Sequence, residues 1–115
     1  MSNLTIHRGA TEQIQTFVAP ASLVTGSTIY FMAKRRKTDA DADAVLSYSL
    51  GAGITVEDEP TGEIITQIEP ADTRVLDNVS QKQFYEIEIE KADNIYHIED
   101  GVLTILPEVI QRALP

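Results

Sequence analysis

The chain has 115 residues, of which 43% are hydrophobic, and its 18 acids against 9 bases give a net charge of -9. This length predicts a single domain over residues 1–115, with residues 106–115 as a C-terminal extension. The acidic balance makes nucleic-acid binding unfavourable and leaves room for a basic partner. No apolar run approaches the roughly 20 residues of a membrane span, so we expect no membrane partner.

The chain contains no cysteine. This absence excludes disulfides, thiolate catalysis and zinc sites built on sulfur. Small secreted domains often carry disulfides, so the cytoplasm is the expected place of synthesis and folding. Residues 1–8 lack a charged region followed by an apolar one, and we therefore expect no signal peptide.

Short strands are predicted along the first half of the chain, separated by glycine and proline. We expect them at residues 4–6, 13–18, 27–35, 45–50, 54–56 and 63–68. A polar loop or a single helical turn is expected at 38–44. The 27–35 strand alternates apolar residues on both faces, which is typical of a central strand.

The second half opens with a predicted helical turn at 70–76, where proline suits the first turn. The 84–90 strand places Tyr85, Ile87 and Ile89 on one face and glutamates on the other. A hairpin is predicted from strands 95–99 and 102–106 around Asp100-Gly101. Pro107 can then open a last short helix over 108–114.

This order of elements predicts an all-β fold. We expect an immunoglobulin-like antiparallel β-sandwich of about eight strands, with one short helical crossover and a short C-terminal helix. Tyr85 follows the crossover, where sandwich domains often carry a tyrosine whose hydroxyl ties the corner. An ordinary core aromatic is the alternative for Tyr85.

Several motifs partly match known functional motifs, but none matches one completely. The Asp39–Asp43 run begins like an EF-hand loop, but Ala44 and Leu50 occupy that loop's sixth and twelfth positions. The remaining alternatives for this run are a metal-binding loop of looser geometry or a solvated loop.

His7 and His97 form a base or metal pair only if the fold joins them. Glutamates 86, 88 and 90 lack a cleft and resemble a solvated strand edge. We expect no enzyme, no catalytic residue, no metal site and no cofactor.

Two segments are candidate partner-binding sites. The first is the basic cluster Lys34, Arg35, Arg36 and Lys37. It binds nucleic acid or an acidic partner, or it is a solvated strand end whose cations are neutralised by the adjacent aspartates. The second is the C-terminal stretch with Val109, Ile110 and Leu114. A helix this short is unstable alone, so its apolar side must cover its own sandwich or a neighbouring subunit.

The order of the turn markers suggests a family. The runs are Ile6–Thr11, Leu23–Lys34, Gly62–Ile64, Asp72-Thr73, Tyr85–Ile89, Ile98–Ile105 and Pro107–Val109. Together they resemble small immunoglobulin-like domains of tailed bacteriophages, in particular the N-terminal domain of baseplate upper proteins. The likeness spans about residues 6 to 109 and departs from the family at Ala10, where an acid is common.

The resemblance implies a non-enzymatic virion structural protein, made in the host cytoplasm, that docks onto other phage structural proteins. A homo-oligomer or ring within the tail, baseplate, head–tail region or capsid surface is expected. One alternative is a small metal-dependent enzyme or binding protein using His7, His97 and the Asp39–Asp43 loop. Another is a carbohydrate-binding or adhesin-like sandwich, which the 6% aromatic content and the absence of tryptophan disfavour.

Overall fold

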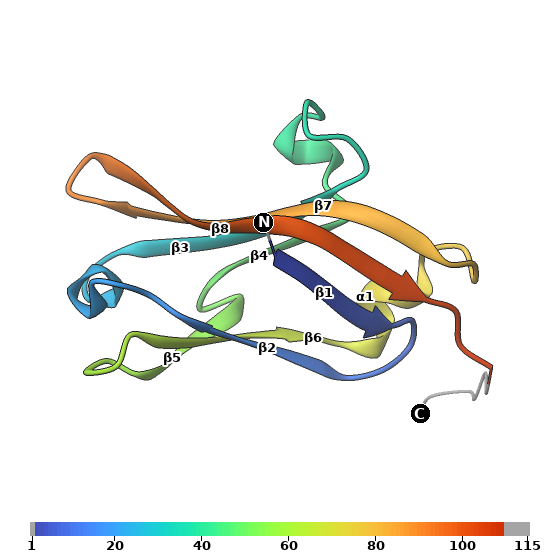
Figure 1. Cartoon of the computed structure of the whole chain (residues 1–115), viewed down its shortest axis with the longest axis horizontal. Coiled ribbons are helices and arrows are strands. Elements are labelled where there is room, and N and C mark those ends of the chain that lie inside the picture. Colours follow the sequence, from blue (N-terminus) through green and yellow to red (C-terminus); the bar gives the residue numbers. More distant parts are fainter. Residues whose placement is uncertain (1, 110–115) are drawn as a thin grey trace.

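A computed structural model describes residues 2–109, which form eight strands, two 3-10 turns and one short α-helix (Figure 1). The strands are β1 (Ser2–His7), β2 (Glu12–Phe17), β3 (Thr28–Lys34), β4 (Leu46–Leu50), β5 (Gly53–Asp58), β6 (Glu63–Ile68), β7 (Gln81–Lys91) and β8 (Asn94–Leu106). The turns are η1 (Ala21–Val24) and η2 (Asp41–Asp43), and the helix is α1 (Pro70–Arg74). No helix within 2–109 is long and apolar enough to cross a membrane.

The strands pair in the order β1-β8-β7-β3-β4-β5-β6-β2 and fold into two facing layers (Figure 1). One layer contains β1, β8, β7, β3 and β4, and the other contains β5, β6 and β2. The layers are joined where β4 meets β5 through only two residue pairs, Ser49 with Gly53 and Leu50 with Ile54. The predicted immunoglobulin-like sandwich is therefore confirmed, although β1 runs parallel to β8 and β4 runs parallel to β5.

One hydrophobic core fills the space between the layers. On β7 the predicted faces are confirmed, because Tyr85, Ile87 and Ile89 are buried while Glu86 and Glu90 are exposed. The predicted central position of β3 is also confirmed, since it lies between β7 and β4. The core residues with no exposed surface include Ile29, Phe31, Ile54, Ile64, Ile68, Ile87, Ile89, Leu103 and Ile105.

The helical crossover begins where expected and ends two residues earlier. Pro70 occupies the first turn of α1, and Glu69 and Asp72 form a reciprocal capping box. The Tyr48 hydroxyl donates a hydrogen bond to the Asp72 carboxylate at 2.8 Å and so ties α1 to β4. Burial, followed by this hydrogen bond, raises the pKa of Tyr48, which keeps the hydroxyl a donor at neutral pH.

The predicted hairpin at Asp100-Gly101 is wrong. These residues lie inside the uninterrupted strand β8, where Asp100 pairs with Glu86 and Gly101 pairs with Tyr85. The turn lies at Ala92 and Asp93, whose φ angles of 52° and 64° provide the two left-handed positions that a tight hairpin requires. The long β7–β8 pairing, with its buried alternate residues, outweighs the local turn preference of Asp-Gly.

Tyr85 connects the core to the β7–β8 pair. Its ring stacks on Phe31 with centroids 5.6 Å apart, and its hydroxyl donates to the Glu99 carboxylate at 2.6 Å. Its register partner on β8 is Gly101, which has no side chain to compete for the space beside the ring. Gly101 therefore accommodates Tyr85 and does not form a turn.

The predicted C-terminal helix is not seen where it can be assessed. Glu108 and Val109 follow β8 in a non-helical conformation. The rest of that prediction, including Ile110 and Leu114, lies outside the described residues.

Candidate protein-interaction sites

The α1 end of the sandwich is organised around the carboxylate of Glu108. Arg8, in the loop after β1, and Arg74, at the end of α1, both form ion pairs with it. Arg74 donates from Nε and Nη2 at 3.2 and 3.1 Å, which is a two-pronged contact. We call this group of three the Glu108 clamp. It fixes the end of the described chain to the β1–β2 loop and to the crossover.

The clamp satisfies its charged groups almost completely. The Glu108 side chain is only 9% exposed, and hydrogen bonding from Arg74 is the main effect that lowers its pKa. Arg8 also donates to the backbone carbonyls of Leu76 and Arg74, each at 2.9 Å. Both arginines are thus occupied by this internal structure and are not free to bind a ligand.

The position of Gly9, beside the Glu108 clamp, requires a glycine. Its φ of +78° is left-handed, and a Cβ atom there would lie within 2.4–2.7 Å of the Glu108 carboxylate. Its amide donates to the hydroxyl of the fully buried Thr73 at 2.8 Å. The Arg8-Gly9 pair and the Pro107-Glu108 pair therefore form one structural unit.

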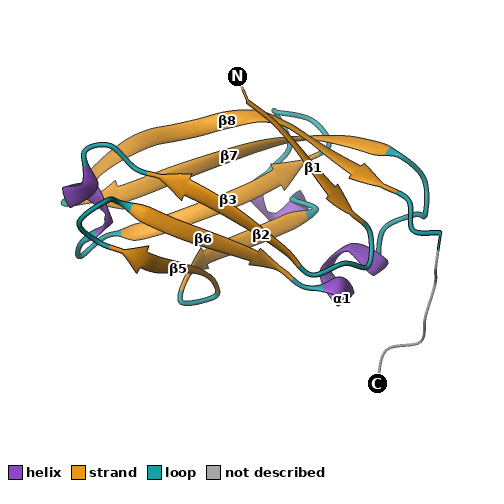
Figure 2. Cartoon of the chain, turned by 60° about the horizontal axis from the view of Figure 1, so that its bottom comes forward, coloured by secondary structure: helices purple, strands orange, loops and turns teal. Residues whose placement is uncertain are grey.

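Three valines project from the same end. Asn78 exchanges two hydrogen bonds with the backbone of Glu108, at 3.1 and 2.8 Å. The residue after each of Arg74, Asn78 and Glu108 is a valine, and these valines are 81%, 56% and 94% exposed. We call Val75, Val79 and Val109 the valine end. Figure 2 shows that the described chain finishes at this end, beside α1.

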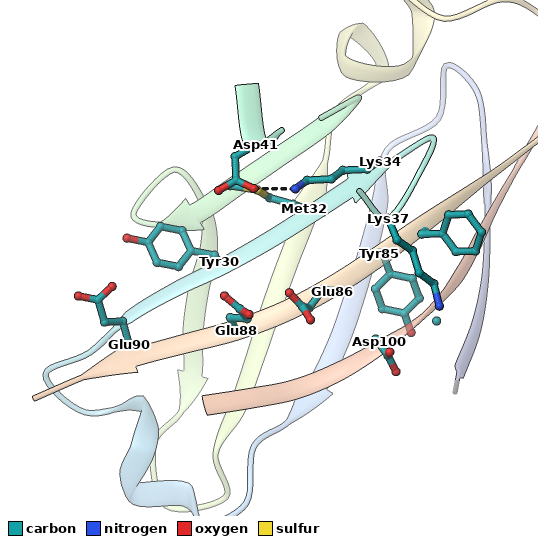
Figure 3. Close-up of a pocket in the computed structure, with 12 residues that line it drawn as sticks. Tyr30, Met32, Lys34, Lys37, Asp41, Tyr85, Glu86, Glu88, Glu90 and Asp100 are labelled. Carbon is teal, nitrogen blue, oxygen red and sulfur yellow. Dashed lines mark hydrogen bonds and ion pairs between the residues drawn. The ribbon is translucent and has the colours of Figure 1, made fainter. Parts of the chain in front are cut away.

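The second feature is a groove of about 460 Å³ on the outer face of the β3–β7–β8 layer (Figure 3). Strand register arranges its floor in rows across the sheet. Lys34 pairs with Phe84, Met32 with Glu86, Tyr30 with Glu88, and Thr28 with Glu90. On the other side of β7, the same four β7 residues pair with Val102, Asp100, His97 and Ile95.

Glu86 and Glu90 are solvated as expected, but they do not lie at a sheet edge, and the expectation that they lack a cleft is wrong. The strand β7 is flanked on both sides, by β3 and β8, so its acids lie on a sheet face within a groove. Burial raises the pKa of Glu88, and its hydrogen bond with Glu86 and the charge of Glu86 add to this shift. The face therefore carries crowded negative charge.

A register shift on β8 brings a histidine to this face. Glu99 pairs with Ile87 and His97 with Glu88, so Ile98 between them has no partner on β7. The shift leaves Glu99 facing inward to Tyr85 while His97 lies outward beside the acids. The His97 Nδ1 atom lies 2.9 Å from Glu86, and Nε2 lies 3.9 Å from Asp100.

The basic cluster sits at one end of this groove and divides into two kinds of residue. Lys34 contacts the Asp41 carboxylate at 2.6 Å, as neutralisation by the aspartates predicts, and Lys37 lies 5.2 Å from the Phe84 ring centroid. Arg35 and Arg36 are exposed, and their side chains form no ion pair with any residue within 2–109. The loop that carries them stands above the outer face of the sheet (Figure 1).

The structure does not bring the histidines into one site. His7 pairs with Leu106 on β8, which is nine residues beyond His97, a separation of about 30 Å along the strand. His7 instead lies 3.7 Å from Glu12. No three histidine or acidic side chains in residues 2–109 are grouped so that they could hold a metal ion.

Reasoning from the sequence missed both the clamp and the position of His97. Arg8 and Glu108 are 100 residues apart, and no local pattern reports a contact of that range. The position of His97 depends on the β7–β8 register, which the misplaced hairpin concealed. The Arg-Gly and Pro-Glu pairs were visible only as markers at either end of the family resemblance.

Comparison with known proteins does not assign the chain. No family model matches it, and no curated protein matches it. Among the solved structures that match is the major subunit of the type I aggregative adherence fimbriae of Escherichia coli. The match covers 92% of this chain and 89% of that one at 10% identity, with a TM-score of 0.28.

Proposed function

We propose that this chain is a non-enzymatic structural protein of a tailed-phage virion, and that it docks onto neighbouring phage proteins through its valine end. The observation that carries the proposal is the Glu108 clamp with its three exposed valines. A clamp that satisfies nearly all of its charged groups internally is suited to holding an apolar surface rigidly. Exposed apolar groups at one end of a fold favour protein contact over catalysis.

The family resemblance supports placing this docking role in a phage particle. Its first and last motifs, Ile6–Thr11 and Pro107–Val109, meet in the clamp through Arg8 and Glu108. These two motifs therefore belong to one structural unit, which supports the proposal.

Incorporation into particles tests the proposal. A phage lacking the gene is complemented with Val75→Lys combined with Val79→Lys, or with a chain truncated after Val109. The truncation keeps Glu108, so the clamp stays intact. Because both valines are exposed, we expect the melting temperature to change little while incorporation falls at least about tenfold, equivalent to about 1.4 kcal/mol.

Phe17→Lys is the matched control, because Phe17 is 60% exposed but lies on β2. It should be incorporated like the natural chain. Equal incorporation of the Val75/Val79 variant and the natural chain would contradict docking through this end.

A further inference from the structure

The sheet order leaves two strands that are paired on one side only, β1 and β2. The free edge of β1 is partly blocked, because the His7 amide donates to the Glu12 carboxylate at 2.8 Å and the His7 carbonyl accepts from the Ala10 amide at 3.2 Å. The strand β2 pairs with β6 in an unbroken register and contains neither proline nor lysine. Edge strands usually carry such residues or a bulge, which prevent pairing with another chain. The β2 edge therefore lacks the usual protection.

Alternation along β2 shows which backbone groups face its free edge. The Val18 amide donates to the Gly62 carbonyl, on the β6 side, at 2.9 Å. Because the backbone groups of successive residues point to opposite sides of a strand, those of Gln13, Gln15 and Phe17 point to the free edge. These backbone groups form no hydrogen bond within the described residues 2–109. Three amides and three carbonyls are therefore available to a further strand.

We propose that the β2 edge pairs with the same edge of a second copy of the chain, in an antiparallel arrangement with a two-fold axis at Gln15. This register sets Gln15 opposite Gln15 of the other copy, and Gln13 opposite Phe17 of the other copy, and it forms about six backbone hydrogen bonds. An axis at Gln13 or Phe17 would bring residues from outside β2 into the pair. A shift of one residue would turn the bonding groups away from each other.

A second copy suits this edge because the centre of the edge carries no charge, although the chain has a net charge of -9. The outer-face row through the axis contains Ile65 and Gln15 of each copy. A glutamine amide both donates and accepts hydrogen bonds, so it can pair with its own copy, whereas an acid or a base on the axis would repel itself. Pairing at this edge therefore keeps the acidic surfaces of the two copies apart.

The nearest acids, Glu12 and Glu63, are separated across the proposed axis. Each already has an internal partner, since Glu12 accepts from the His7 amide and Glu63 accepts from the side-chain amide of Gln15. In this register the two copies of each acid lie about 20 Å apart. Glu12 of one copy and Glu63 of the other lie two strand spacings apart, about 10 Å, on opposite faces of the sheet. Salt screens repulsion over that distance.

The pairing leaves both valine ends free. The strand β2 begins near α1, because Glu12 pairs with Ile68 two residues before Pro70, and it runs to the opposite end of the sandwich, where η1 follows (Figure 1). The two-fold axis reverses this direction in the other copy, so the dimer has a valine end at each of its two ends. The inference goes beyond the proposed function and does not depend on it, because docking through the valine end requires no β2 pair.

Sedimentation velocity of the natural chain over a rising concentration series tests the association. A single strand pair is smaller than the standard interface of about 1,600 Å², so we expect a weak dimer that forms only above about 1 μM. Because two copies with a net charge of -9 repel each other, dimerisation should strengthen as salt is raised. A chain that stays monomeric up to about 1 mM would overturn the inference and would leave the β2 edge for a strand of another protein.

Proline substitution tests whether the β2 edge forms the contact. Gln15→Pro removes an amide that faces the second copy and no hydrogen bond of the β2–β6 ladder, so the dimer should be at least about tenfold weaker. Thr5→Pro is the matched control. The Arg8 amide donates to the Leu106 carbonyl on the β8 side at 2.9 Å, so the same alternation turns the Thr5 amide to the free edge of β1. Thr5→Pro should dimerise like the natural chain, and circular dichroism melts check both folds. Unchanged dimerisation of Gln15→Pro would contradict pairing through β2.

Cysteine cross-linking tests the register, since the chain has no cysteine of its own. In the proposed pair, the two copies of position 15 have Cα atoms about 5.5 Å apart, which suits a disulfide. Gln15→Cys should therefore form a covalent dimer under mild oxidation. Gln13→Cys lies on the same edge and face but should stay monomeric, because its two copies are offset by four residues, about 13 Å.

Thr55→Cys measures cross-linking by random collision. Thr55 is exposed and lies in the row of Ile65, but on β5, about 24 Å from its own copy in the proposed dimer. Fast cross-linking of Gln15→Cys, with slow cross-linking of the other two variants, would support the two-fold register even if Gln15→Pro does not fold. Equal rates for Gln15→Cys and Gln13→Cys would overturn it.

Discussion

Arg8 and Glu108, 100 residues apart in the sequence, form an ion pair that joins the loop after β1 to the chain beyond β8. Arg74 contacts the same carboxylate from the end of α1, so three distant segments share one anchor. The valine end is built on this anchor. Its rigidity therefore depends on the charge of a single glutamate.

The first prediction concerns that charge. The pKa of Glu108 is lowered, mainly by hydrogen bonding from Arg74, so its stabilising effect is present above the carboxyl's ordinary value of 4.5 and is lost as pH falls. Glu108→Gln should lower the melting temperature at neutral pH. The gap from the natural chain should shrink as the pH drops below 4.5, since the natural carboxyl then becomes protonated. A gap that is constant over the whole range would show that the charge is unimportant.

The second prediction concerns Glu88→Gln. The pKa of Glu88 is shifted in the opposite direction to that of Glu108. The pKa of Glu88 is raised, first by burial and then by Glu86, so the folded state loses stability as pH rises above 4.5. Glu88→Gln should therefore raise the melting temperature at neutral pH by a few degrees, as relief of about 0.2–1 kcal/mol of like-charge repulsion implies. This gain should vanish in acid.

Glu57→Gln is the control for the second prediction. It removes the same charge from an exposed position on β5, in the other layer of the sandwich. If Glu57→Gln stabilises as much as Glu88→Gln, the gain comes from the lower net charge and not from the outer-face groove.

The third prediction tests the position of the hairpin turn. Ala92 has a left-handed φ of 52°, which glycine adopts without the steric cost that a Cβ brings. Ala92→Gly should stabilise the protein by up to about 1 kcal/mol, seen as a higher urea midpoint. A loss of stability would place the turn elsewhere, for example at the Asp100-Gly101 pair first predicted.

That turn also shows where reasoning from the sequence stops. The strand faces of β7 and the central position of β3 follow from alternation over a few residues, and the structure confirms both. The hairpin was misplaced because Asp-Gly is a strong local signal, whereas the competing β7–β8 register is set by 11 residue pairs. The turn preference of two residues contributes little compared with the strand pairing of a ladder of that length.

The candidate sites were predicted less well than the fold. Lys34–Lys37 and Val109 were selected from charge and apolar character, and these two properties are local. Which cations remain unpaired depends on the approach of Asp41 to Lys34 across the loop. The groove could not be foreseen, because its floor combines residues of β3, β7 and β8 through long-range pairing.

The fourth prediction addresses the metal-dependent alternative. Asp41 contacts Lys34, and an Asp39 carboxylate oxygen accepts a hydrogen bond from the Arg36 amide at 3.3 Å, so two acids of the loop already have partners. The melting temperature should be equal in excess calcium and in chelator, since a ligand that binds only the folded state would raise it. A clear upward shift with calcium would restore the Asp39–Asp43 loop as a binding site.

The composition of purified phage particles shows whether this chain is a virion component. Tailed phage particles from cells that carry this gene would be banded on a density gradient and quantified by mass spectrometry against known virion proteins. We expect this chain in the particle band at a fixed ratio to a tail, baseplate or capsid protein. A chain that is abundant in the lysate but absent from the banded particles would contradict this expectation.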